Sequence, residues 1–143
     1  MALPVIALAR TIGLTAVLCA SALIAAGTAQ ALVFFKSPSG NIGCVLGKRD
    51  GVRCDIREKS WKPPPKPSWC DVDWGGGVQV GRRNRASFVC AGDTVLGADR
   101  TLRYGNSIRR GRFECFSRRT GMRCVNHRNH HGFKLSREHV KLF

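Results

Sequence analysis

Apolar residues along the chain come in short runs, separated by polar segments rich in glycine and proline. Residues 32–35, 77–80, 86–89 and 113–116 are such runs, and β-branched or aromatic side chains dominate them. Long helical periodicity is absent from the chain after residue 31. Many short β-prone runs between turn signals predict an all-β domain, a small sandwich or barrel built from hairpins.

Two segments of the chain repeat one hairpin pattern around a pair of cysteines. Residues 41–46 and 52–56 flank a polar turn that ends in glycine, and residues 112–117 and 122–126 do the same. Each flanking run carries a central cysteine, so the two cysteines of one hairpin are expected to face each other. Directly opposed residues in an antiparallel pair lie about 4.5 Å apart at Cα, a distance that a disulfide can bridge.

The cysteine count supports this pattern. Cys19 falls in the N-terminal apolar segment, and the six that remain are Cys44, Cys54, Cys70, Cys90, Cys115 and Cys124. An even number in a small exported domain predicts a disulfide framework in an oxidising compartment, although sequence alone leaves fifteen pairings open. The hairpins favour Cys44 with Cys54 and Cys115 with Cys124, which leaves Cys70 for Cys90. No two of the six form a Cys-x2-Cys pair, so we expect no metal site and no cofactor.

The N-terminus has the pattern of a signal peptide. One early cation, Arg10, is followed by an apolar run over residues 12–26 and by the small-residue ending Ala29-Gln30-Ala31. We expect cleavage after Ala31, which makes residues 1–31 the signal peptide and residues 32–143 a single mature domain without a membrane span. The alternative is an uncleaved anchor, because apolar character resumes at residues 32–35. The expected location is secreted, periplasmic or in the cell envelope.

Two further segments carry local signals. The proline-rich residues 61–67 must be extended, because each proline fixes its own φ and restricts its predecessor. We interpret them as a rigid crossover that stacks on the domain's own tryptophans, rather than as a ligand for the groove of a partner. Residues 136–143 offer an N-cap serine, an acidic residue in the first turn and a cation in the last, and they predict one short C-terminal helical turn.

Positive charge dominates the chain. It has 24 Lys and Arg against nine Asp and Glu, and loss of Arg10 with the signal peptide leaves a net charge of about +14. Such a field favours salt-sensitive binding to polyanions, and guanidinium groups bind phosphate or carboxylate with paired hydrogen bonds. A role in solubility alone is the alternative. The candidate anion-binding residues, all near predicted turns, are Arg82, Arg83, Arg85, Arg109, Arg110, Arg112, Arg118 and Arg119.

A candidate polar site consists of Asp93, Thr94 and His131. Asp93 and Thr94 follow a predicted strand end, where such residues also make side-chain bonds to the backbone for structural reasons, and we favour that interpretation. Four histidines near the C-terminus could supply an acid and a base together with Asp93 or Glu114; they are His127, His130, His131 and His139. No nucleophile elbow, phosphate loop or dinucleotide fingerprint is present, so no catalytic residue is assigned and the sequence favours a protein that is not an enzyme.

An ordered series of short motifs resembles a family of short exported bacterial proteins, each built on one domain of unknown function. The motifs are residues 37–44 (SPSGNIGC), 52–55 (VRCD), Trp61 with Pro63 and Pro64, 73–75 (DWG), 88–94 (FVCAGDT), 104–105 (YG), 121–126 (GMRCVN) and 131–137 (HGFKLSR). They cover nearly the whole chain after the signal peptide. One departure is Asn129-His130, where the family has a small Thr-Gly-like turn. The resemblance implies no activity, cofactor or catalytic residue.

These features favour an exported, non-enzymatic module that binds an anionic envelope polymer, lipid headgroups or a protein partner. One alternative is an inhibitor of a secreted enzyme, in which a disulfide-pinned loop limits the entropy cost of binding. Another is a small secreted hydrolase that uses the C-terminal histidines. Tyr104, Phe113 and Phe116 interleave with arginines as stacking platforms for nucleic acid do, but export argues against nucleic acid as the partner.

Overall fold

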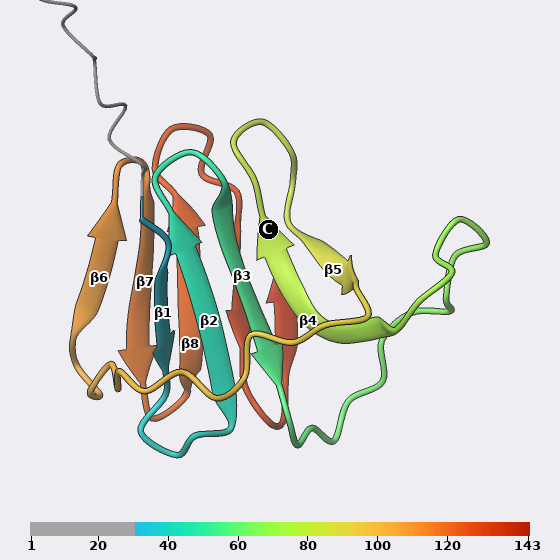
Figure 1. The fold of residues 1–143 in the computed structure, drawn as a ribbon, viewed down its shortest axis with the longest axis horizontal. Helices are drawn as coiled ribbons and strands as arrows, with labels where there is room; N and C mark the ends of the chain where they lie inside the picture. The colour runs from blue at the N-terminus through green and yellow to red at the C-terminus, as the bar shows by residue number, and fades with distance from the viewer. Residues whose placement is uncertain (1–30) are drawn as a thin grey trace, which may run out of the picture.

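The computed structural model describes residues 31–143, and all of their regular structure is β-strand, arranged in two sheets (Figure 1). The first sheet contains, in spatial order, β1 (Val33–Lys36), β2 (Ile42–Gly47), β3 (Gly51–Ile56), β4 (Trp74–Val80) and β5 (Ser87–Cys90). The second contains β10 (Val140–Leu142), β9 (Gly132–Leu135), β8 (Gly121–Asn126), β7 (Phe113–Arg118) and β6 (Ser107–Arg110). Both sheets are antiparallel and open, so the predicted all-β fold is confirmed, and it is a sandwich rather than a closed barrel.

The core lies between the two sheets and follows from the alternation of side chains along each strand. On β7, Phe113, Cys115 and Ser117 point inward and are buried, whereas the residues between them are partly exposed. Three phenylalanines from the two sheets fill the centre of the core. They are Phe35, Phe113 and Phe133, and none of them has exposed surface. Each open sheet thereby covers the apolar face of the other.

All three predicted disulfides are confirmed. Cys44 pairs with Cys54 across β2 and β3, and Cys115 pairs with Cys124 across β7 and β8, with Cα atoms 4.1 Å apart in both hairpins. The two bridges face each other through the core, since the Sγ atoms of Cys54 and Cys124 are 3.8 Å apart. The third bridge, Cys70 to Cys90, ties the segment before β4 to the end of β5.

The strand connections divide between two ends of the sandwich. The connections β2–β3, β4–β5, β6–β7 and β8–β9 lie at one end, at the top of Figure 1, and the chain enters β1 at that same end. The turns β1–β2, β7–β8 and β9–β10 lie at the opposite end, at the bottom of the figure. Antiparallel order therefore brings together segments that are far apart in the sequence.

The prediction of a C-terminal helical turn is wrong. Residues 140–142 form β10 instead, which pairs with β9, and Phe143 exchanges two backbone hydrogen bonds with Gly132. Ser136, the expected N-cap, accepts a hydrogen bond from the backbone N–H of His139 and donates one to its carbonyl oxygen in the tight β9–β10 turn. A single helical turn has too few internal hydrogen bonds to compete with pairing along the free edge of β9.

The proline-rich segment packs on the domain's own residues. Trp74 donates a hydrogen bond from Nε1 to the carbonyl of Pro64, at 2.9 Å. A side chain on Gly75 would collide with the ring of Pro63, so the proline lies directly on the backbone of β4. Trp61 in turn donates to the carbonyl of Ser136, which joins the crossover to the second sheet. This arrangement agrees with a rigid crossover.

Candidate anion-binding surface

Seven cations gather at the end of the sandwich where β2–β3, β4–β5, β6–β7 and β8–β9 connect. They line two shallow hollows of about 370 and 390 Å³. We call these residues the basic end; they are Lys48, Arg49, Arg82, Arg83, Arg109, Arg112 and Arg128. All are exposed except Arg112, which is half-buried. The surface is therefore a shared product of both sheets.

No member of the basic end forms an ion pair within residues 31–143. The ion pairs in this part of the chain form at Arg53, His127 and Arg137. Asp50, in the same turn as Lys48 and Arg49, lies over Gly47. Like charges held this close repel each other, and the surface gains stability when an anion binds between them.

Arg112 lies at the centre of this repulsion. Partial loss of hydration, together with the positive charges of Arg128, Arg82 and Arg83, lowers the pKa of Arg112 from its ordinary value. The guanidinium remains charged near neutral pH, because its ordinary pKa lies several units higher. Its neighbours come from both sheets, since Arg112 lines both hollows together with Arg82 of the first sheet and Arg128 of the second.

A buried side chain, Asn126, fixes the loops of the basic end to one another. Its side-chain amide donates to the carbonyl oxygens of Gly81 and Arg82, at 3.1 and 3.2 Å, and its Oδ1 accepts the backbone N–H of Arg128 at 3.0 Å. Asn126 has no exposed surface. It therefore links the arginine-bearing loop of the first sheet to that of the second.

The β6–β7 turn is held by a backbone hydrogen bond to the residue that follows β8. The backbone N–H of His127 donates to the carbonyl of Arg112 at 2.8 Å. Gly111 adopts a φ of +58° in this turn, and a side chain there would press on Lys48 from the other sheet. Glycine is favoured at this position for two reasons, because it accepts the left-handed conformation and it leaves room for Lys48.

The eight predicted anion-binding arginines do not form one site. Four of them, Arg82, Arg83, Arg109 and Arg112, belong to the basic end. Arg118 is the last residue of β7 and Arg119 follows it in the β7–β8 turn, at the opposite end of the sandwich. Arg85 borders a hollow on the outer face of the first sheet, and Arg110 is an exposed residue of β6.

Sequence reasoning missed three members of the basic end. Lys48 and Arg49 occupy the turn of the first predicted hairpin, and Arg128 follows the last strand of the second. The order of the strands could have revealed them, because every second connection between consecutive antiparallel strands lies at the same end of the sheet. Runs of arginine alone do not indicate Lys48, Arg49 and Arg128, because none of the three lies in such a run.

The candidate polar site divides into separate structural roles. Arg53 binds the buried carboxylate of Asp55 and the exposed one of Asp93, at 2.8 and 2.9 Å. Thr94 donates its hydroxyl to Asp55, at 3.1 Å, and the backbone N–H of Val95 also binds that carboxylate. The hydrogen bond and charge of Arg53 hold the pKa of Asp93 below its usual range. This network fastens the β5–β6 connection to β3.

His131 does not take part in that network. Its backbone lies in the β8–β9 connection, where its N–H donates to the side chain of Asn129 and its carbonyl accepts from Asn126. The neighbouring His130 has a φ of +60°. Glycine adopts this left-handed conformation freely, and His130 is the one residue other than glycine that adopts it within residues 31–143.

One histidine has an acidic partner. His127 Nε2 lies 2.7 Å from Glu114 Oε2, and Ser107 donates its hydroxyl to the other carboxylate oxygen of Glu114 at 2.9 Å. Partial burial opposes ionisation of Glu114, but these two hydrogen bonds and the charges of His127 and Arg109 outweigh it and lower the pKa of Glu114. The pair lies on the outer face of the second sheet, and none of the cavities described above includes it.

The fold and the surface together define a small, disulfide-stapled β-sandwich with one strongly basic end. The chain matches the family of unknown function DUF6636 over residues 13–143, and it belongs to that family. Comparison with curated proteins and with solved structures gives no significant match. The predicted resemblance to a family of unknown function is thereby confirmed.

Three disulfides fit a protein that folds outside the reducing cytoplasm. Over residues 31–143 there is no helix that is long and apolar enough to cross a membrane. The predicted signal peptide lies, apart from Ala31, outside the residues that the structure describes.

Proposed function

We propose that the protein is a non-enzymatic binding module that docks through its basic end on a phosphate-bearing anionic surface of the cell envelope. The observation that carries the proposal is the set of seven cations, gathered from four connections and without an ion-pair partner in residues 31–143. Several guanidinium groups on one rigid face can bind several phosphates at once.

A lipid surface fits this end better than a free polymer does. The chain enters β1 at the basic end (Figure 1), and Leu32, which is 47% exposed, lies against Gly47 in the same region. Phe34, two residues later, is 49% exposed on the outer face of β1. Apolar side chains beside a group of cations suit the boundary between headgroups and acyl chains.

The experiment compares binding of oxidised protein to phosphatidylcholine vesicles with and without phosphatidylglycerol. We expect binding only to the anionic vesicles, and we expect it to fall steeply as salt rises from about 50 to about 200 mM. Long-chain polyphosphate, added as a competitor, distinguishes a lipid surface from a polymer. If polyphosphate binds far more tightly than the vesicles, a polymer is the partner.

A charge-matched pair of variants locates the surface. Arg82→Ala, Arg112→Ala and Arg128→Ala together should weaken vesicle binding about 100-fold, because each cation near an anionic surface contributes several-fold to affinity. The control combines Lys66→Ala, Arg100→Ala and Arg103→Ala, which removes the same charge from exposed positions away from the basic end. Equal loss in the two triple variants would mean that net charge, and not this surface, determines binding.

A further inference from the structure

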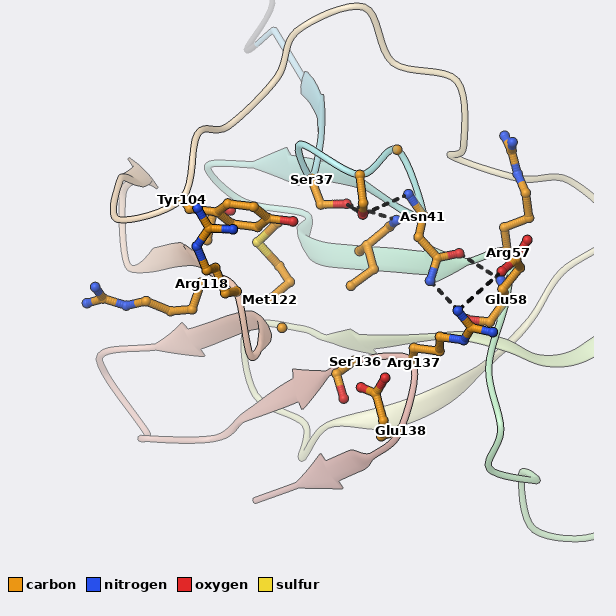
Figure 2. A pocket seen from close by; sticks show the side chains of 16 residues that line it. Ser37, Asn41, Arg57, Glu58, Tyr104, Arg118, Met122, Ser136, Arg137 and Glu138 are labelled. Carbon is orange, nitrogen blue, oxygen red and sulfur yellow. Dashed lines mark hydrogen bonds and ion pairs between the residues drawn. The ribbon is translucent and has the colours of Figure 1, made fainter.

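Another cavity lies at the opposite end of the sandwich, among turns of both sheets, and Figure 2 shows the side chains that line it. Its volume is about 380 Å³, which falls within the range of small-molecule sites. Its walls come from the turns β1–β2, β7–β8 and β9–β10, the segment after β3 and the loop before β6. Both sheets therefore contribute, and none of the lining residues belongs to the basic end.

Ser117, one of the residues that line this cavity, has a buried hydroxyl without a partner. Ser117 occupies an inward-facing position of β7 and is 1% exposed. Its Oγ makes no hydrogen bond, and it is the one buried side-chain oxygen or nitrogen without a partner among residues 31–143. Buried polar groups in folded proteins are nearly always satisfied, so an orphan hydroxyl at a cavity marks a place where a ligand or water supplies the missing bond.

The loop that closes one side of the cavity is fixed to this strand. The backbone N–H of Gly105 donates to the carbonyl of Ser117, and the backbone N–H of Ser117 donates to the backbone carbonyl of Asn106. Tyr104 is thereby held over the cavity, with its hydroxyl directed toward the turn at Ser37 and Asn41 (Figure 2). The guanidinium of Arg119 lies 5.2 Å from the centre of the Tyr104 ring. The cavity is therefore surrounded by the unpaired hydroxyl of Ser117, the aromatic ring of Tyr104 and several arginines.

The remaining wall is polar and has a surplus of cations. Arg57, Arg118 and Arg119 form no ion pair within residues 31–143, while Arg137 contacts Glu58 at 3.9 Å. The carboxylates of Glu58 and Glu138 can accept hydrogen bonds from hydroxyl groups. Free guanidinium groups suit a carboxylate or phosphate, and serine and carboxylate oxygens suit a ligand with several hydroxyl groups.

We infer that this cavity binds a monosaccharide-sized anion with several hydroxyl groups, a sugar acid or a sugar phosphate. Arg118 contacts the acidic group, Ser117 supplies a buried hydrogen bond, and the ring of Tyr104 covers an apolar face of the sugar. The site is independent of the basic end. A variant that lacks Arg82, Arg112 and Arg128 should bind the same ligand with unchanged affinity.

The test is an NMR titration of oxidised protein with glucuronate, glucose 6-phosphate, glucose and inorganic phosphate. We expect saturable shifts at the amides of Ser117, Tyr104 and Asn41 with at least one of the two sugar anions, and this result also tells carboxylate from phosphate. The affinity for glucose and the affinity for inorganic phosphate should each be lower than that for the sugar anion by a factor of about ten or more. The absence of saturable shifts with both sugar anions would overturn the inference, as would equal binding of glucose or of phosphate alone.

Two variants separate a ligand site from a structural position. Ser117→Ala should leave the thermal midpoint of the free protein unchanged or higher, because it removes an unsatisfied hydroxyl, yet it should weaken sugar binding about fivefold. Arg118→Ala should weaken binding about tenfold. Ser87→Ala and Arg110→Ala, at exposed positions outside the cavity, are the matched controls. Unchanged affinity in both cavity variants contradicts the inference.

Discussion

Asn126 offers the most direct test of how the two sheets are held together at the basic end. Replacing Asn126 by alanine removes the three hydrogen bonds that its side chain makes with the backbone of Gly81, Arg82 and Arg128. Each such bond contributes about 1 kcal/mol net, so the free energy of unfolding should fall by about 3 kcal/mol. For a domain of this size, that loss corresponds to a thermal midpoint roughly 10–15 °C lower.

The assay is guanidinium unfolding of the oxidised protein, followed by tryptophan fluorescence and circular dichroism. Asn106→Ala is the control, because Asn106 is exposed and its side chain makes none of the hydrogen bonds found in residues 31–143. The control should change the free energy of unfolding by less than about 0.5 kcal/mol. A loss below about 1 kcal/mol for Asn126→Ala would refute the argument that this amide cross-links the loops.

Two further predictions concern charged groups outside the basic end. Asp55→Asn should lower the free energy of unfolding by about 3 kcal/mol, because Asp55 is 4% exposed and the change leaves Arg53 without its buried charged partner. Asp93→Asn, at an exposed carboxylate of the same network, should lower it far less. Denaturant unfolding of both variants checks this difference. The lowered pKa of Glu114 means that its ionised form stabilises the native state above the ordinary carboxyl pKa, and that this contribution is lost as the pH falls through the lowered value. A carboxyl-detected NMR titration should show the midpoint of Glu114 moving up in the variant Ser107→Ala with His127→Ala, and an unchanged midpoint would contradict the assigned cause.

Local patterns in the sequence predict the parts of the fold that depend on neighbouring residues. The two cysteine hairpins are visible because each contains its strands, its turn and both cysteines within a short stretch, so Cys44 to Cys54 and Cys115 to Cys124 follow from register alone. The third disulfide then follows by elimination. The C-terminal segment shows the limit of this reasoning, because its local helix signals are weaker than pairing along the edge of β9.

The candidate surface depends on contacts that local patterns do not contain. Whether Arg118 and Arg82 share a surface is decided by the end of the sandwich to which each connection belongs, and they lie at opposite ends. Asn126 resembles an ordinary strand-end residue in the sequence, and its role depends on carbonyl groups about 45 positions earlier in the chain. The orphan hydroxyl of Ser117 likewise emerges only when the packing around β7 is known.

The central claim, that the basic end contacts an anionic lipid surface, is tested most directly by paramagnetic NMR. Bicelles that contain phosphatidylglycerol and a headgroup-labelled paramagnetic lipid broaden the amide signals of residues nearest the surface. We predict broadening in the β2–β3, β4–β5, β6–β7 and β8–β9 connections, and its loss when Arg82, Arg112 and Arg128 are replaced by alanine. Broadening centred on the β1–β2 and β7–β8 turns, at the opposite end of the sandwich, would contradict the claim.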